Sequence, residues 1–466
     1  MPEPTFATPA ALNVEKISQL VSAESLLAYT DDLTSIQPYS GWRSGGSLGE
    51  TEALDYLESR LNSFSALLEN GLALERQSFS IYMNTEFWDS SLIVTVNQQP
   101  YTIPAEGLRG SRHYRRTTSY FDSDGIIGDT NSNPLTAEGD LLVILDPHQL
   151  ETTGRDEAEG KILFIDYTLL DTYVNPQAVE NIGLFLTLVD EGLAGVVFVT
   201  QYSNSPRISR GSQMAEGIDF TFTVPSNHVP FLFVRIEDLS AAGVADCEQL
   251  IEIEKANLRL DTDVLSPGVS GNLAARIPGM DQSRAIILSA HIDSPNTPGA
   301  FDDGSGSAAL LEIARVFDVV GQKPPVDVYL VWYGSHELCT CGSAHFASTH
   351  QSLLDRTLAV VNMDGLGYPL DIRPSTVTVA ATTYRRFGEE EFPLFDFLSE
   401  TAALQGLELE TYVIDSQIGD NSNYDAFNVP NVNLYYLNTR EIEVMGWTYM
   451  HYGNHWHDPY ETADLV

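Results

Sequence analysis

Residues 285–316 of this 466-residue chain read AIILSAHIDSPNTPGAFDDGSGSAALLEIARV. The run 285–290 is continuously apolar, which is typical of a strand buried on both faces. From residue 306 onward, apolar side chains recur at helical spacing and predict one amphipathic helix. A strand, a loop rich in glycine and acidic residues, and a helix in this order form the unit from which α/β proteins are built. The apolar face expected for the helix consists of Ala309, Leu310, Ile313, Val316, Phe317 and Val320.

The same alternation of apolar runs and helical patterns continues toward the carboxyl end. Runs that are apolar on both faces, separated by helices, indicate a largely parallel sheet covered on both sides. The fold class predicted from them is therefore α/β, with a mostly parallel central sheet flanked by helices on both faces. The further strands are expected at 326–333, 357–363, 375–381, 410–414 and 432–437, and a helix at 393–404.

The amino-terminal part shows a different pattern of apolar and polar residues. Residues 12–64 predict two helical stretches around a Gly/Ser loop; the second begins near Ser47, with Glu50 at capping-box distance. Residues 77–104 alternate apolar and polar side chains, as antiparallel strands do. From 122 to 258, short apolar runs between Gly, Pro, Asn and Asp clusters predict a β-rich segment with one or two helices. We therefore expect three parts: 1–118 as the first part of the main domain, 119–260 as an insert, and 261–466 as the core.

Composition excludes several classes of partner. Asp and Glu number 65 against 24 Lys and Arg, which gives a formal net charge of −41. Such a charge repels phosphate backbones and anionic lipid headgroups, so we expect neither nucleic acid nor a membrane surface as partner. No window approaches the ~18 consecutive apolar residues of a spanning helix, so no membrane span is expected.

The chain has three cysteines, Cys247, Cys339 and Cys341, too few for a disulfide scaffold. Cys339 and Cys341 are two residues apart, a spacing that is awkward for a mutual disulfide. We expect both to be small buried packing residues.

Residue types that bind metals follow three of the predicted strands. Because loops beyond the carboxyl ends of parallel strands meet in one crevice, these side chains are expected to converge on a shared site. Imidazole and carboxylate ligands in this number suit zinc, and two metals that share a carboxylate suit hydrolysis. The candidates are His291, Asp293, Asp302, His336, Glu337 and Asp364.

Four motifs carry a resemblance to a known family. HIDSPNTPGAFDDGSGSAALLEIARV, SHELCTCGSAHF, VVNMDGLG and HDPYET, in this order and spacing, resemble the co-catalytic zinc aminopeptidases. That superfamily also includes glutamate carboxypeptidase and the glutaminyl cyclases. Within the insert, AEGKILFIDY and AGVVFVT resemble a protease-associated domain. The resemblance implies a zinc exopeptidase fold with a protease-associated-like insert.

Carried over residue by residue, the resemblance implies a centre with two zinc ions. His291 and Asp364 would bind one ion and Glu337 and His457 the other, with Asp302 bridging the two. Asp293 would orient His291, as carboxylates do for metal-bound imidazoles. The remaining implied features are a cis peptide bond between Asp302 and Asp303, His455 or His451 as competitors of His457, and Asp420 and Tyr424 beside the substrate pocket.

The sequence departs from the family pattern at two positions. The family has a glutamate as general base where this chain has His336, and often a tyrosine where this chain has Trp456. His336 is interpreted as the proton shuttle itself, since an imidazole titrates near neutral pH. Two further interpretations stay open: a metal-bound pseudo-peptidase that only binds, and His336 as an additional metal ligand. Trp456 keeps an N–H donor, although not an acidic one.

Together these features predict a zinc-dependent exopeptidase, most simply an aminopeptidase that removes N-terminal residues from peptides. A binding protein with a silent metal site and a glutaminyl-cyclase-like acyl transferase are the alternatives. The family implies a mature chain that is secreted or held in the cell envelope, with the cytoplasm as the other option. The sequence leaves the oligomeric state open.

Overall fold

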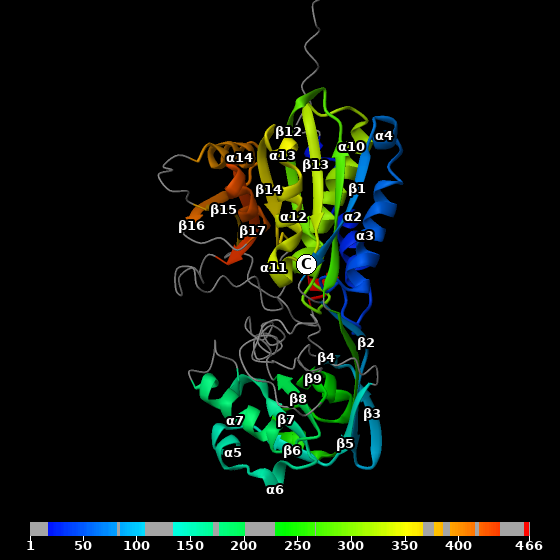
Figure 1. Ribbon diagram of the computed structural model, residues 1–466, viewed down its shortest axis with the longest axis vertical. Helices are drawn as coiled ribbons and strands as arrows, with labels where there is room; N and C mark the ends of the chain where they lie inside the picture. Colours follow the sequence, from blue (N-terminus) through cyan, green and yellow to red (C-terminus); the bar gives the residue numbers. More distant parts are fainter. Residues whose placement is uncertain are drawn as a thin grey trace, which may run out of the picture.

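A computed structural model of the protein describes residues 17–81, 84–107, 134–170, 177–200, 229–265, 267–366, 377–384, 392–414, 419–438 and 461–465. Figure 1 shows two bodies, a larger one built on a single broad sheet and a smaller one that contains two further sheets. Within these residues, no helix combines the length and apolarity that crossing a bilayer requires.

The broad sheet has eight strands, and its centre is parallel. β12 pairs in parallel with β13 and β14, and β14 pairs in parallel with β17. The pairings of β1 with β11, β11 with β13, and β15 with β17 are antiparallel. The predicted α/β class with a mostly parallel central sheet is thus confirmed, with antiparallel pairings toward both edges. In spatial order the strands are β1 (Ala73–Ile81), β11 (Gly268–Ile277), β13 (Val326–Tyr333), β12 (Asp281–His291), β14 (Thr357–Met363), β17 (Asn431–Asn438), β15 (Val377–Tyr384) and β16 (Leu409–Ile414).

Helices cover both faces of this sheet, as the alternation along β13 shows. Leu330 and Trp332 pack into one apolar cluster, whereas Val331 and Tyr333 pack into another, because successive side chains of a strand point to opposite faces. The first cluster includes side chains of α2 (Ala23–Thr34), α3 (Leu48–Leu61), α4 (Ser65–Glu69) and α10 (Gly306–Val320) (Figure 1). The second includes side chains of α12 (Cys341–Thr349), α13 (Gln351–Leu354) and the 3-10 helix η8 (Asp420–Phe427), while α14 (Pro393–Leu404) packs on β16.

The smaller body contains one antiparallel and one largely parallel sheet. The antiparallel sheet has the order β3 (Gln99–Ile103), β2 (Asn84–Val96), β10 (Ile253–Leu265) and β5 (Leu135–Gly139). The second has the order β4 (Glu106–Gly107), β9 (Phe231–Arg235), β8 (Gly195–Thr200), β7 (Ile162–Asp166) and β6 (Leu141–Ile144). The helices of this body are α5 (Pro147–Thr152), α6 (Arg155–Ala158), α7 (Ala178–Asp190), α9 (Ile236–Leu239), η2 (Tyr167–Leu169), η4 (Ser240–Ala242) and η5 (Cys247–Glu252).

The chain leaves and re-enters the broad sheet at one place. The last residue of β1, Ile81, is paired with the first residue of β11, Gly268. The antiparallel strands predicted within 77–104 are confirmed, but β2 and β3 lie in the smaller body and start it at Asn84. The expected boundary at 118/119 lies outside the described residues, so the three-part division stays a prediction.

Glu50 links the first helices to the loop after β13. Ser47 caps α3 by accepting the Glu50 amide at 3.3 Å, as predicted. The Glu50 carboxylate instead accepts the amides of Gly46 and Ser335 and the hydroxyl of Ser270, each at 2.9 Å. Burial raises the pKa of this carboxyl to about 8, and the charge of Asp293 raises it as well. Glu50 therefore fixes the position of Ser335, the residue before His336.

Replacing Glu50 by alanine should destabilise the fold strongly. The change leaves two buried donors and one half-buried donor without their acceptor, for which we expect a loss of about 2–4 kcal/mol in the free energy of unfolding. Urea denaturation measures this loss. The matched control is Glu69→Ala at an exposed position of α4, which should change stability by less than about 0.5 kcal/mol. Equal effects of the two variants would contradict the role of Glu50.

Candidate metal centre

The predicted site residues meet at the carboxyl ends of β12, β13 and β14. His291 is the last residue of β12, and Asp302 lies in the turn η6 (Ala300–Ser305) before α10. Glu337 belongs to α11 (His336–Cys339), which follows β13, and Asp364 follows β14 directly. Two groups have ligand atoms within 4.8 Å of one another: His291 with Asp302 and Glu337, and His291 with His336 and Asp364.

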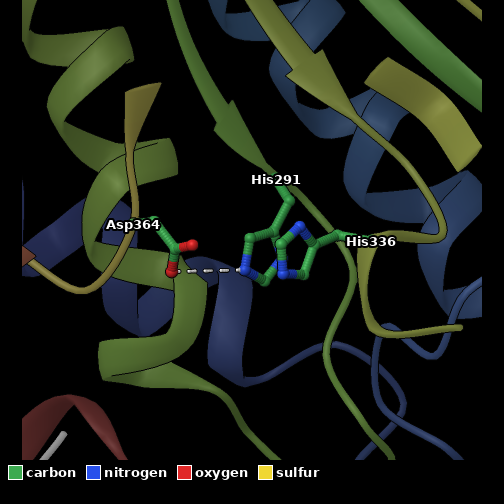
Figure 2. A group of neighbouring side chains, drawn as sticks. All are labelled: His291, His336 and Asp364. Atoms are coloured by element: carbon green, nitrogen blue, oxygen red, sulfur yellow. Dashed lines mark ion pairs between the residues drawn. The ribbon is translucent and has the colours of Figure 1, made fainter. Parts of the chain in front are cut away.

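His291 lies at the centre of both groups and is fully buried. Its Nε2 is 2.8 Å from Asp302 Oδ1 and 3.7 Å from Asp364 Oδ1, and Figure 2 shows the latter pair. Burial lowers the pKa of His291, but its contacts with Asp293, Asp302 and Asp364 outweigh burial and raise the pKa well above its usual value. The Nε2 atom therefore faces a strongly negative environment, the kind in which a divalent cation is stabilised.

Asp293 acts on both sides of the site. Its backbone carbonyl oxygen is 3.0 Å from His291 Nδ1, whereas its carboxylate is 3.6 Å from the same atom. The carboxylate accepts the amides of His336 at 2.9 Å and Glu337 at 3.1 Å. The predicted orienting role of Asp293 toward His291 thus involves its main chain, and its side chain positions the two residues that follow β13.

The turn that carries Asp302 is held from two directions. The peptide bond between Asp302 and Asp303 is cis, as the resemblance implied. The buried Asp303 carboxylate accepts the amides of His291 at 3.1 Å, Gly306 at 2.8 Å and Gly365 at 3.2 Å. Glu461 accepts the Asp302 amide at 2.5 Å through its carboxylate, and the Ala300 amide at 2.8 Å through its carbonyl oxygen.

Arg43 is a fully buried cation next to this turn. Its guanidinium donates to the carbonyl oxygens of Ile292 at 2.9 Å, Leu33 at 3.0 Å, Pro298 at 2.6 Å and Gly299 at 2.9 Å. Burial lowers its pKa to about 10, although the surrounding carboxylates raise it. Its charge therefore compensates part of the acidic cluster while its hydrogen bonds fix the loop 292–299. The carboxylates in question are Glu461, Asp293, Asp303 and Asp302.

Sequence reasoning missed Glu461, Arg43 and Glu50 as supporting residues of this site, and it placed Asp303 in the loop before the helix without assigning it this role. Asp303 carried a usable signal, because an aspartate three residues before Gly306 is typical of a helix start. Arg43 lies in a Gly/Ser loop where no pattern marks it.

His336 is paired with Asp420. The distance from His336 Nδ1 to Asp420 Oδ2 is 2.9 Å, and the imidazole stacks on that of His291 with ring centroids 4.0 Å apart. Burial and the charge of His291 lower the pKa of His336, but Asp420 and Asp364 outweigh both and raise it to about 10. A divalent cation among these carboxylates would act in the same direction as His291 and lower this pKa.

Two residues predicted beside the substrate pocket have other surroundings. Tyr424 is fully buried in the cluster with Phe346, and its hydroxyl is hydrogen-bonded to that of Tyr333. A side chain without exposed surface packs in the core, so the expected place of Tyr424 beside the substrate pocket stays a prediction. Asp420 is also fully buried, between His336 and Ser343. The remaining candidates Trp456 and His457, with His451 and His455, lie outside the described residues.

The structure corrects the expectation for two cysteines. Cys339 and Cys341 form a disulfide, with Cα atoms 5.0 Å apart, inside the range of about 4.4–6.8 Å that such bonds need. Thr340 between them has a φ of 47°, and this left-handed conformation turns the chain back so that the two side chains meet. Cys339 is exposed, so neither cysteine is a plain packing residue.

The donor set fits a metal ion. His291, Asp302, Glu337 and Asp364 offer one imidazole nitrogen and three carboxylates, and such N/O sets suit zinc. The carboxylates are buried or half-buried, and buried like charges need a compensating cation. Fold and site together define an α/β domain with a candidate metal centre at the carboxyl ends of its central strands.

Residues 272–466 match the model of Peptidase family M28. The resemblance to the co-catalytic zinc aminopeptidase family is thereby confirmed for this part of the chain. In structure, the chain is similar to BSAP, a zinc aminopeptidase from Bacillus subtilis, with a TM-score of 0.55 at 19% identity over 96% of this chain and 90% of that one. At this identity the likeness concerns the fold.

Curated relatives match over short stretches. Leupeptin-inactivating enzyme 1 of Streptomyces exfoliatus is 33% identical over 107 residues, 22% of this chain and 24% of that protein. Aminopeptidase YwaD of Bacillus subtilis is 30% identical over 126 residues, 26% of this chain and 27% of that protein. The chain thus spans about a quarter of the length of these relatives.

Zinc should stabilise the metal-free protein. Binding to the folded state alone adds about 2.7 kcal/mol at a free concentration about 100 times Kd, so Tm rises with zinc in a thermal scan. His291→Asn should reduce the rise clearly, because both ligand groups contain His291. The control His148→Asn changes a side chain that is 82% exposed and should keep the rise. An undiminished rise in the His291 variant would show that zinc binds elsewhere.

Thiol titration tests the disulfide. Cys247 is buried and lies outside the disulfide, so the denatured, unreduced chain should show one reactive thiol. After reduction the same assay should give three, the total number of cysteines. Three thiols before reduction in protein prepared under air would contradict the Cys339–Cys341 bond.

Proposed function

We propose that this protein is a metal-dependent aminopeptidase that hydrolyses N-terminal residues of peptides. The observation that carries the proposal is the convergence of His291, Asp302, Glu337 and Asp364 at the strand ends, within a part of the chain that matches Peptidase family M28. Two proteins with similar sequence or fold are named as aminopeptidases. The insert is proposed to be a protease-associated-like domain on the strength of its motifs.

The proposed centre holds two zinc ions. His291 and Asp364 would hold one ion, Glu337 and His457 the other, and Asp302 would bridge them. The three carboxylates near His291, those of Asp302, Glu337 and Asp364, carry more negative charge than one divalent ion balances, which supports a second ion. Bound zinc would supply a Lewis acid for the scissile carbonyl and a nucleophilic water at neutral pH.

The chain's own residues prepare this chemistry. Asp303 holds the backbone of His291, and Asp293 holds the amides of His336 and Glu337, so the ligands are positioned before substrate arrives. Glu461 and Arg43 fix the loop that presents Asp302. His336 is the proposed proton shuttle in the position where the family has a glutamate.

The proposal predicts chelator-sensitive cleavage of an aminoacyl p-nitroanilide. The zinc-loaded protein should release nitroaniline, the N-acetylated substrate should be resistant, and Asp302→Asn should abolish turnover because a bridging carboxylate is lost. The control Asp140→Asn, at a side chain that is 64% exposed, should change the rate by less than about twofold. Initial rates with and without chelator measure all four expectations.

The same assay separates the alternatives. A wild-type chain that binds zinc and stays silent, but becomes active as His336→Glu, would be a binding protein that has lost its general base. Cyclisation of N-terminal glutamine with about one bound zinc would identify a glutaminyl cyclase instead. Either result contradicts the aminopeptidase proposal.

A further inference from the structure

Asp420 is placed to act on His336 and on nothing outside the protein. The carboxylate has no exposed surface, and its Oδ2 lies 2.9 Å from His336 Nδ1. It reaches the site from the start of η8, 84 residues further along the chain. A peptide substrate has no access to a carboxylate in this position, so substrate binding, the role expected from the sequence, does not explain it.

The other oxygen of this carboxylate is held by Ser343. The Ser343 hydroxyl has one proton and two acceptors nearby, Asp420 Oδ1 and the carbonyl oxygen of Thr340. Asn423 Nδ2 donates to Thr340 O at 3.2 Å and to the Ser343 oxygen at 2.8 Å. The Thr340 carbonyl oxygen therefore already accepts a hydrogen bond from Asn423. The Ser343 hydroxyl can then donate its proton to Asp420. Both carboxylate oxygens have fixed partners, which leaves Asp420 a single orientation.

The His336 ring is oriented by stacking as well as by this hydrogen bond. Its plane is inclined by only 7° to that of His291 at a centroid distance of 4.0 Å. The lone pairs of imidazole nitrogens lie in the ring planes, so two stacked parallel rings do not direct theirs at one common ion. Figure 2 shows the His336 ring beside the His291 ring, from which one nitrogen faces Asp364. Asp420 binds Nδ1 of His336, so Nε2 is the ring nitrogen that Asp420 does not bind. This geometry disfavours His336 as a second imidazole ligand of the ion that His291 holds.

We infer that Asp420, oriented by Ser343, is a positioning residue that keeps the proton of His336 on Nδ1 and thereby leaves Nε2 as the proton acceptor of the peptidase site. The inference rests on the proposed function. It assigns to His336 Nε2 the proton transfer for which the family uses a glutamate. An aspartate that fixes an imidazole tautomer in this way is the arrangement that serine proteases use.

The proton balance of this arrangement is complete. A water oxygen forms a bond to the scissile carbonyl carbon while one of its protons moves to His336 Nε2. The peptide C–N bond then breaks, and that proton passes from Nε2 to the leaving amine nitrogen. Asp420 stays ionised throughout, and His336 returns to its starting tautomer.

Steady-state kinetics of Asp420→Asn in the zinc-loaded protein distinguish positioning from substrate binding. An amide can present its NH2 group to Nδ1 and favour the wrong tautomer, so kcat should fall by about 100-fold or more while KM changes by less than about threefold. The matched control is Asp425→Asn in the same 3-10 helix, where the carboxylate accepts Asn431 Nδ2 at 2.7 Å. It should stay within about twofold of wild type. A raised KM with unchanged kcat would make Asp420 a substrate-binding residue and overturn the inference.

Two further variants test whether Asp420 acts through His336. Ser343→Ala leaves the carboxylate in place with one partner fewer, so its loss of kcat should be smaller than that of Asp420→Asn. In a His336→Gln background, Asp420→Asn should cause no further loss, because the group that it positions is absent. Additive losses would overturn the inference. Zinc content and Tm of each variant show whether the protein is folded and loaded.

A spectroscopic measurement is independent of turnover. In zinc-loaded protein labelled with 15N-histidine, the His336 resonances, assigned by their loss in His336→Gln, should show a protonated Nδ1 and a free, unprotonated Nε2. Asp420→Asn should shift this proton and Asp425→Asn should not. A zinc-bound or protonated Nε2 in the wild type overturns the inference. If no peptide is cleaved but these resonances are as expected, the proposed function fails and the pairing of Asp420 with His336 stands.

Discussion

Buried negative charge is the constraint on which the structure around the strand ends depends. Asp293, Asp303 and Asp420 have no exposed surface, and Asp302, Glu461 and Glu50 have almost none. An ionised carboxylate taken out of water costs several kcal/mol unless it is paired or hydrogen-bonded. The backbone here is shaped to meet that demand, because loop amides of Gly46, Ser335, His336, Glu337, Gly306 and Gly365 all point at carboxylate oxygens. The loops that carry the metal ligands are thus ordered by the acids themselves.

The positive groups near the buried carboxylates act in different ways. Arg43 contributes charge but directs its donors at carbonyl oxygens, so it compensates the field without occupying a ligand atom. The amino terminus of α10 adds the positive end of a helix dipole next to Asp303. His291 is left with its Nε2 toward Asp302 and Asp364, and the centre keeps an acidic excess that a divalent ion can balance.

Much of the core could be predicted because its signals are local. The apolar runs of β12, β13 and β14 mark buried strands, and residues just beyond such strands necessarily share one edge of the sheet. The direction of β15 relative to β17 could not be predicted, since a strand buried on both faces is equally apolar in either direction. The disulfide depends on the left-handed conformation of Thr340, and the partner of His336 lies 84 residues away. Neither dihedral angles nor long-range contacts are encoded in spacing.

The pairing of Ile81 with Gly268 bears on how the protein can change in evolution. The smaller body is inserted between β1 and β11, which would otherwise form a plain β-hairpin. The pairing of these two strands in the broad sheet therefore does not depend on the length or sequence of the insert. Among the described residues, one of its contacts with the loop after β12 is the hydrogen bond from Asn296 Nδ2 to the carbonyl oxygen of Gly107 at 2.7 Å. Exchange of the insert would therefore alter what surrounds the centre while the charges that assemble it are inherited unchanged.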